Sequence, residues 1–207
     1  MALQRRLAGL VVLQPLPEPV GLVAGADVGY RDQGGTVVAA VAVHTFPGLE
    51  LVELAHVEDR VSFPYVAGLL SFREMPPLLS AFKRLRHRPD VVLCDGQGLA
   101  HPRRFGLAAH LGLWLDLPTV GCAKSRLVGE HAKVGPRRGQ YRSLMDRSER
   151  VGMALRTRTG VKPLYVSPGH LADMEGSRRL VLCCCRGFRV PEPIRTAHQT
   201  VQRAIKA

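Results

Sequence analysis

The fold is decided in residues 20–45, which read VGLVAGADVGYRDQGGTVVAAVAVHT. Two apolar segments, Val20–Tyr30 and Thr36–Thr45, flank the Gly-rich turn signal Arg31–Gly35. A second short turn leads to a third apolar segment, Leu51–Val57. Three strands joined by short turns predict an antiparallel meander.

The pattern then alternates between helices and short strands. Apolar residues recur at helical spacing over Ser71–Leu85, and Asp90–Asp95 is a short strand that ends in a carboxylate. A helix is predicted over His101–Leu115, with Pro102 in its first turn, before a buried strand at Thr119–Ala123. The order strand-strand-strand-helix-strand-helix-strand predicts the α/β class. Later elements are predicted at Gly152–Thr157 and Pro163–Val166 (strands) and at Leu171–Cys185 and Arg195–Lys206 (helices, the second after the stop Pro191–Pro193).

Length and composition indicate one globular domain over residues 1–207. Of the 207 residues, 46% are hydrophobic and 22% charged, so the chain can bury a core without disulfides or a structural metal. The polar, basic segment 128–142 has no apolar periodicity and is predicted to be a mobile loop. The longest apolar run, Val37–Val43, is too short to cross a bilayer, so no membrane partner is expected.

Charge is distributed unevenly along the chain. Residues 1–100 hold nine Lys and Arg against ten Asp and Glu, whereas residues 101–207 hold twenty against seven. The excess of +12 therefore lies wholly in the second half, which favours a basic face toward a polyanion such as nucleic acid. A basic surface without such a role is the alternative that composition alone leaves open.

The cysteines and the N-terminus bear on the compartment. Five cysteines without a C-x-x-C pair predict free thiols in a reducing cytoplasm and no zinc site. The apolar stretch Leu7–Leu13 is at the short limit for a signal peptide and is followed by prolines, so a cytoplasmic location is predicted.

Acidic residues are few within the apolar segments. Asp27 lies near the end of the first predicted strand and Asp95 ends the fourth. Burial of an unpaired carboxylate is costly, and two carboxylates on neighbouring strands can hold a divalent cation. Asp95 also fits a turn or cap role, which suits Asp27 poorly. Glu74, in the next helix, is a third candidate, although a solvated helix residue is equally compatible with the spacing.

Three basic or polar residues could act beside these acids. Lys124 follows directly on an apolar strand, where it could meet a phosphate oxygen or reach solvent. His101 opens the predicted helix beside the loop Gly96–Gly98, a combination that presents N–H groups to anions. His198 stands in a polar helix and by itself is typical of a surface histidine. Acids at two strand ends, a basic second half and the order of elements together predict a metal-dependent nuclease of ribonuclease-H-like fold, with a mixed central sheet (three antiparallel strands followed by parallel strands) flanked by helices.

Six segments resemble the endonuclease V family of deoxyinosine-specific repair nucleases. The resemblance runs from about Gly25 to His198, and the most specific motif is DGQGLAHPRRFGLAAHLG. The segments are Gly25–Tyr30 (GADVGY), Pro64–Glu74 (PYVAGLLSFRE), Asp95–Gly112, Leu115–Leu127 (LDLPTVGCAKSRL), Pro163–His170 (PLYVSPGH) and Pro191–His198 (PEPIRTAH).

The resemblance implies a Mg²⁺-dependent endonuclease of DNA repair, with Mn²⁺ as a substitute. Asp27, Asp95 and His198 would hold the metal, and Glu74 would complete the cluster directly or through metal-bound water. Lys124 would steady the scissile phosphate. Relatives hydrolyse the second phosphodiester bond 3′ to the lesion and leave 3′-hydroxyl and 5′-phosphate ends. A monomer acting on deoxyinosine-containing DNA is expected.

The resemblance also implies which residues bind the substrate. Tyr65, supported by Pro64, would enter the duplex as a wedge. His101 would lie near the recognised base or the active site. The extruded hypoxanthine would enter a pocket formed by backbone near Gly68, Leu70, Gly96, Gly98 and Gly121, because backbone groups can read the edge of a flipped base.

Two positions depart from the usual family motifs, and two other functions remain open. The wedge usually reads P-Y-I-P, whereas Ala67 stands here in place of the second proline, which should loosen the loop. Gln97 stands where many relatives have His. An endoribonuclease acting on inosine-containing RNA would share the catalytic residues. A catalytically silent nucleic-acid-binding relative is disfavoured because all five candidate catalytic residues are present.

Overall fold

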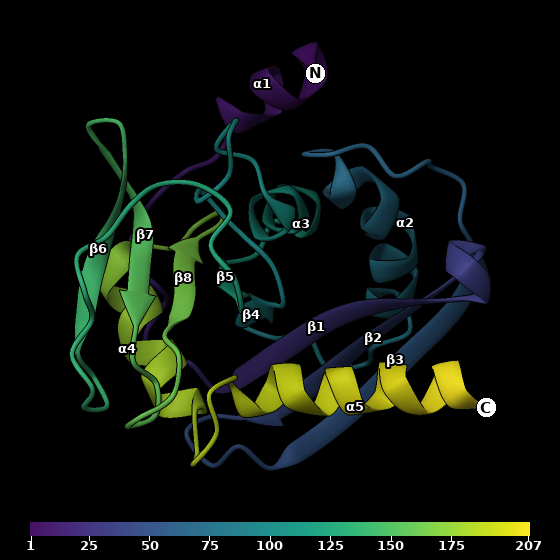
Figure 1. Cartoon of the computed structure of the whole chain (residues 1–207). Coiled ribbons are helices and arrows are strands. Elements are labelled where there is room, and N and C mark those ends of the chain that lie inside the picture. The colour runs from purple at the N-terminus through teal and green to yellow at the C-terminus, as the bar shows by residue number, and fades with distance from the viewer.

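A computed structural model describes residues 1–207 as one eight-stranded open sheet flanked by helices (Figure 1). The strands are β1 (Leu22–Arg31), β2 (Thr36–Thr45), β3 (Leu51–Arg60), β4 (Val91–Cys94), β5 (Thr119–Ala123), β6 (Tyr141–Asp146), β7 (Glu149–Leu155) and β8 (Leu164–Pro168). The helices are α1 (Ala2–Ala8), α2 (Leu70–Phe82), α3 (Leu107–Leu115), α4 (Met174–Cys184) and α5 (Glu192–Lys206), with a short 3₁₀ turn at Asp32–Gly34.

The sheet has the spatial order β3-β2-β1-β4-β5-β8-β7-β6. Strands β1 to β3 form the predicted antiparallel meander, and β4 and β5 run parallel to β1. This part confirms the predicted mixed sheet. Beyond β5 the sheet becomes antiparallel again, because β8 runs against β5, and β7 and β6 follow as hairpin partners.

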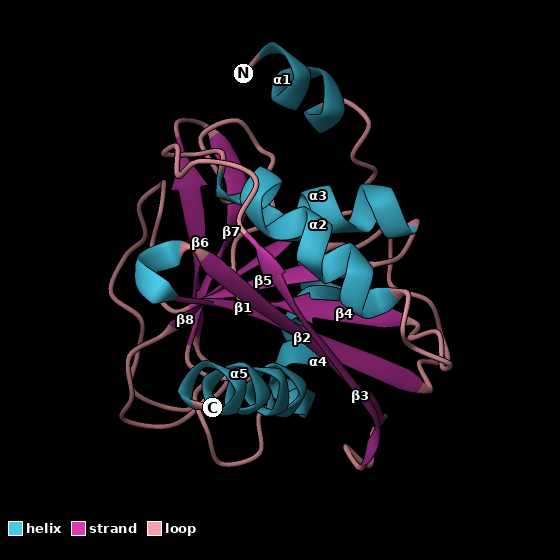
Figure 2. Cartoon of the chain, turned by 90° about the vertical axis from the view of Figure 1, so that its right-hand side faces the viewer, coloured by secondary structure: helices cyan, strands magenta, loops and turns pink.

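Alternate residues of the central strands divide the core into two layers. On β4, Leu93 packs with residues of α4 and the start of α5, whereas Val92 and Cys94 pack with α2 and α3. The same alternation on β2 places Ala40 against α5 and Val41 against α2. Helices therefore cover both faces, and the two termini lie on opposite sides of the sheet (Figure 2).

The predicted helix over His101–Leu115 begins too early. Residues 101–105 form a turn in which Arg104 has a φ of +56°, and α3 begins only at Leu107. The reason is a contact outside the helix: the N–H of Ala108 donates to the carbonyl of Gln97, so the Gly96–Gly98 loop pairs a backbone group of the first helical turn. The prediction that His101 opens a helix is wrong for the same reason.

Other boundaries also shift. The segment 128–142 is irregular only as far as Gln140, because Tyr141 and Arg142 already belong to the edge strand β6, which polarity concealed. In its irregular part, the Arg156 guanidinium donates to the carbonyls of Val134 and Gly135. The predicted stop at Pro191–Pro193 is wrong, since α5 begins at Glu192 and tolerates Pro193 in its first turn.

The N-terminal segment belongs to the domain. In α1 the buried Gln4 side chain donates to the carbonyls of Gly68 and Phe105, and Leu16 packs against the core. Neither α1 nor any other helix is long and apolar enough to pass through a membrane.

Candidate metal centre and pocket

Asp27 faces α5 from the middle of β1. Its neighbours on that face are Gly25 and Gly29, and both are packed by the helix: a Cβ on Gly25 would lie 2.0 Å from the backbone of Pro193, and one on Gly29 would lie 2.6 Å from Val201. Two glycines therefore let α5 lie directly on the strand, and Asp27 is the side chain between them. This spacing is why the motif GADVGY brings a carboxylate to a helix that starts 165 residues later in the chain.

Asp95 reaches the same place from β4. The parallel ladder between β1 and β4 ends at the pair Ala26 and Cys94, and the N–H of Asp95 donates to the carbonyl of Ala26 at 3.1 Å. Asp27 and Asp95 are therefore the next residues on two adjacent strands. The predicted meeting of two acids beside each other is present, although Asp27 lies mid-strand and not at the strand end.

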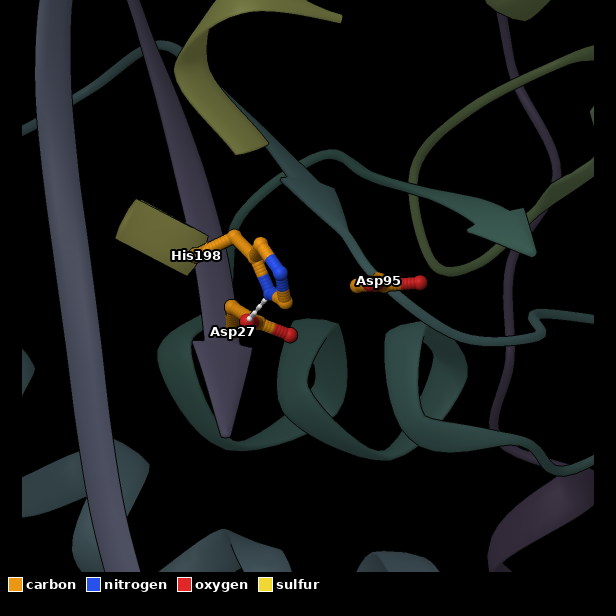
Figure 3. Close-up of side chains that lie close together, drawn as sticks. All are labelled: Asp27, Asp95 and His198. Carbon is orange, nitrogen blue, oxygen red and sulfur yellow. Dashed lines mark hydrogen bonds and ion pairs between the residues drawn. The ribbon is translucent and has the colours of Figure 1, made fainter. Parts of the chain in front are cut away.

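Asp27, Asp95 and His198 form a candidate metal site. Each offers one ligand atom, and these atoms lie within 4.8 Å of one another. Figure 3 shows His198 on α5 joined to Asp27 on β1, with Nδ1 2.8 Å from Oδ2, and Asp95 beside them. When Nδ1 donates to Asp27, the lone pair of Nε2 remains free for a ligand role.

The electrostatics of the cluster favour a cation. Asp27 is 6% exposed, and burial raises the pKa of its carboxyl, with repulsion from Asp95 as the second cause. The hydrogen bond and the charge of His198 act in the opposite direction. Two close carboxylates with so little solvent are stabilised by a bound divalent cation, so the donor set fits such an ion.

Glu74 approaches the cluster from the other face of the sheet. It lies on α2, is 6% exposed, and accepts a hydrogen bond from the Tyr30 hydroxyl at 3.3 Å. Burial raises the pKa of Glu74 to about 8, and the charges of Asp27 and Asp95 add to the effect. The charges of both aspartates thus act on Glu74, but Glu74 is not among the three residues whose ligand atoms lie within 4.8 Å of one another.

A pocket of about 380 Å³ opens beside Asp95 and Glu74. Lys124, which follows β5, forms an ion pair with Asp95 at its wall, and its ammonium is partly exposed. Leu70 and Gly96, two of the residues predicted to lie near the recognised base, also line this pocket. The prediction of site residues missed the other lining residues, which are Ser71, Gln97, Gly106, Leu107, Ala123, Ser125, Arg126 and Leu127. Ser125, Arg126 and Leu127 directly follow Lys124 at the end of the motif LDLPTVGCAKSRL, which was the one signal that could have selected them.

Gly98 and Gly121 do not line the pocket. A Cβ on Gly98 would lie 2.0 Å from the carbonyl oxygen of Pro168, and a Cβ on Gly121 would lie 2.5 Å from the backbone nitrogen of Gly98. These two glycines therefore let the Gly96–Gly98 loop lie directly on β5 and β8. Their contribution to the pocket is its shape.

Gly68 and His101 lie outside the pocket lining, and the His101 ring hydrogen-bonds the backbone of Gly68. The carbonyl of Gly68 accepts hydrogen bonds from Gln4 and from the guanidinium of Arg103, two partners that sequence reasoning missed. His101 is buried, and its Nδ1 accepts from the N–H of Arg103 at 3.2 Å. Burial, with the Arg103 charge second, lowers the pKa of His101 to about 4, so the ring is neutral at physiological pH.

Tyr65 stands free of the domain. Its side chain is 70% exposed in the loop between β3 and α2, and Pro64 beside it is also exposed. An aromatic ring so exposed adds little to the core and is available for contact with a substrate.

An open mixed sheet that carries two aspartates and a lysine at its central strands, with a histidine facing them from the last helix, defines the class of ribonuclease-H-like nucleases. Within that class the chain belongs to the endonuclease V family, because the model of the family named Endonuclease V matches residues 5–199. Membership makes the chain a nuclease and so a hydrolase.

Comparisons with single proteins agree with this assignment. The chain is 51% identical over 203 residues to an Endonuclease V of Dehalococcoides mccartyi (strain CBDB1), covering 98% of this chain and 91% of that protein. The crystal structure of the Endonuclease V from Streptomyces avermitilis superposes with a TM-score of 0.94 at 44% identity, covering 99% of this chain and 91% of that one. A Ciona intestinalis Endonuclease V, crystallised with a 24mer DNA containing an inosine followed by a ribo-adenosine, has a TM-score of 0.85 at 26% identity, covering 99% and 95% of the two chains.

Proposed function

We propose that this chain is a Mg²⁺-dependent endonuclease that recognises deoxyinosine in DNA and hydrolyses the second phosphodiester bond 3′ to it. The products would carry 3′-hydroxyl and 5′-phosphate ends. The observation that carries the proposal is the meeting of Asp27, Asp95 and His198 from three distant parts of the chain, beside a pocket, in a family whose Ciona member binds inosine-containing DNA.

Asp27, Asp95 and His198 would hold the cation. Two carboxylates supply the oxygen ligands that Mg²⁺ prefers, and the imidazole suits Mn²⁺ as well, which is why Mn²⁺ should substitute. A cation held there would supply a coordinated water of lowered pKa and would withdraw charge from the attacked phosphate. Glu74 would act on the cluster through water, since its oxygens lie outside the group of three.

Lys124 would steady the scissile phosphate. Its ammonium forms an ion pair with Asp95, and Lys124 lines the pocket. A phosphate bound there would therefore lie next to a positive charge and beside the proposed metal ligands. Desolvation of the phosphate in this pocket would strengthen that attraction.

The hypoxanthine base would enter the pocket beside Leu70 and Gly96. Backbone N–H and C=O groups along its wall can read the Watson–Crick edge of a base that has left the stack. Gly98, Gly121 and Gly68 would act through the shape of the loops around it, and His101 would hold the Gly68 backbone. Tyr65, supported by Pro64, would fill the space that the extruded base leaves in the duplex.

DNA is the favoured substrate. The RNA alternative shares the catalytic residues, and a silent binding protein is disfavoured because the acidic cluster is intact. A cytoplasmic, monomeric repair enzyme is the form in which we expect this activity.

The experiment is end-labelled cleavage of matched DNA and RNA strands with a single inosine, in Mg²⁺ and in EDTA. Adenosine strands and the Asp95→Asn enzyme are the controls. A cut one nucleotide beyond the DNA lesion, absent with EDTA and with Asp95→Asn, supports the proposal. Cutting of RNA alone would reassign the substrate, and binding without cutting of either strand would leave the silent binding protein as the function.

A further inference from the structure

A second hollow of about 420 Å³ opens at the opposite ends of α2 and α3 from the metal centre. Leu70 begins α2 and lines the pocket beside Asp95, whereas Phe82 ends α2 and lines this second hollow. A helix rises 1.5 Å per residue, so the two sites are about 18 Å apart along α2. A ligand bound in the hollow would therefore leave the metal centre free.

The walls of the hollow are apolar. They are formed by Leu79, Phe82, Leu85, Trp114, Leu115 and Leu117. Trp114, the only tryptophan of the chain, is 64% exposed at the end of α3. An exposed indole over a hollow lined by leucines is the composition of a binding surface, because a large aromatic anchor gains most when a partner covers it.

The hollow continues past Arg88 into a neighbouring one of about 320 Å³. The two share Arg88, Pro89 and Leu117, and the neighbouring hollow adds Pro15 and Pro118 as further walls. We call the two together the α2–α3 groove. Two adjoining hollows suit an extended chain of several residues better than one compact molecule.

The rim of the groove is positively charged. Lys83, Arg86 and Arg88 are exposed there, and no ion pair of the chain includes any of them. Two carboxylates beside the groove already accept backbone hydrogen bonds: Glu53 from the N–H groups of Arg86 and His87, and Asp90, which lines the neighbouring hollow, from those of Gly21 and Leu22. The carboxylate of Asp116, at the end of α3, is exposed. Arg88 donates to the carbonyl of Asp116 at the end of α3, which fixes its guanidinium at the junction of the two hollows.

We propose that the α2–α3 groove binds a short acidic segment of a partner protein, with one bulky apolar side chain of that segment in the hollow beside Trp114. Charge complementarity assigns the acidic residues to Lys83, Arg86 and Arg88, and the apolar walls assign the large side chain. The proposal concerns recruitment of this chain to another protein and does not rest on its substrate.

A single-stranded nucleic acid is the competing ligand for a basic surface with an aromatic residue. Such a strand uses several aromatic platforms on which successive bases stack. The groove offers two exposed rings, Trp114 and His87, and the His87 ring is already paired with the Glu53 carboxylate at 2.9 Å. Phe82 is partly buried, so Trp114 is the one ring free to stack on a base. The geometry therefore favours the peptide.

The test is a binding titration with a fluorescein-labelled peptide of sequence Gly-Asp-Asp-Asp-Leu-Phe, followed by anisotropy and by the emission of Trp114. We expect saturable binding with a change in Trp114 emission. The double variant Lys83→Glu/Arg86→Glu should bind at least about tenfold more weakly, because like charges then face each other. Trp114→Ala should lose about tenfold through the apolar contact.

The matched control is Arg203→Glu, a charge reversal at an exposed position of α5 on the other face of the sheet, which should bind as the unchanged chain does. Peptides with Asn for Asp, or Ala for Leu-Phe, should bind weakly. Thermal unfolding of each variant verifies that it is folded. Absence of saturable binding, or binding that neither variant weakens, overturns the proposal. So does a labelled oligothymidylate that binds where the peptide does not and is lost in the same variants.

Discussion

The metal centre and the loop that carries Tyr65 are built in opposite ways. Asp27 and Asp95 stand on or directly after central strands, and α5 is held against them by two glycines. Tyr65 stands on a loop with its ring in solvent. Burial of a carboxylate costs free energy unless its charge is paired, hydrogen-bonded or bound to a metal, whereas an exposed aromatic ring is common. The buried aspartates therefore indicate a functional site because their burial costs free energy. Exposure of the Tyr65 ring carries no such cost, so Tyr65 is a candidate only through its position in the chain.

The largest effect should come from the metal centre. Asp95→Asn keeps the size of the side chain but removes one of two oxygen-ligand charges, so we expect inosine-DNA cleavage to fall about a thousandfold or more, about 4 kcal/mol in the barrier. Binding of the same DNA, measured in Ca²⁺ by gel shift, should stay within a few-fold, because other groups read the base. Cleavage near the unchanged rate would remove Asp95 from the metal site.

The contrast explains what could be predicted from sequence. Asp27 and Asp95 interrupt or end apolar strands, so periodicity and chemistry made them candidates, and strand pairing brings them together. Lys124 by itself is typical of a strand-end lysine that reaches solvent, and only its combination with the acids and the family resemblance favoured a role at the phosphate. His198 was a surface histidine by its helix pattern, and only family resemblance selected it. The start of α3 and the strand β6 were not predictable, because the first depends on backbone bonds to a distant loop and the second has no apolar period.

For the glycines of the predicted base pocket, the sequence cannot distinguish a role in recognising the base from a role in close packing of the backbone. Gly98 is predicted to lie beside the base, and a Cβ there would lie 2.0 Å from the carbonyl oxygen of Pro168, so close packing alone already requires a glycine. Base recognition by backbone groups and close backbone packing both require a residue without a side chain. Only the position of neighbouring backbone distinguishes them.

The second largest effect should be on stability and should come from Gly98→Ala. A Cβ at 2.0 Å from the Pro168 oxygen meets backbone that cannot rotate away, so we expect a loss of about 3 kcal/mol in the free energy of unfolding. Gly21→Ala is the control, because its nearest atom would lie 3.6 Å away, and it should change stability by less than about 0.5 kcal/mol. Urea unfolding measures both. If the stability of Gly98→Ala is unchanged, packing does not require this glycine, and a role in recognition of the base is favoured.

The pH dependence of stability tests whether His101 has a structural role or a role at the substrate. Its pKa falls from 6.5 to about 4 in the folded chain, so below pH 6.5 the unfolded chain takes up a proton that the folded chain does not. Stability is therefore lost as the pH falls from 6.5 toward 4. At about pH 5 this single residue should account for about 2 kcal/mol.

The measurement compares urea unfolding of the unchanged chain and of His101→Asn at about pH 7.5 and about pH 5. The other buried histidines, such as His110, titrate in the same direction in both proteins, so their effect cancels in the comparison. The loss between the two pH values should be about 2 kcal/mol smaller in the variant. An equal loss in both proteins would show that His101 is not a buried neutral residue, and would favour a direct role at the substrate.

The smallest effect should come from the exposed loop. Tyr65→Ala removes a ring that contacts little of its own chain, so the free energy of unfolding should not change. Cleavage of a duplex with one inosine should fall about tenfold, since base–aromatic stacking contributes about 1–3 kcal/mol. Cleavage of a single strand should fall less, because no partner strand has to be held apart. Tyr65→Phe keeps the ring and should retain most of the duplex activity. Equal losses on duplex and single strand would place Tyr65 in general nucleic-acid binding and would leave strand separation to another part of the loop.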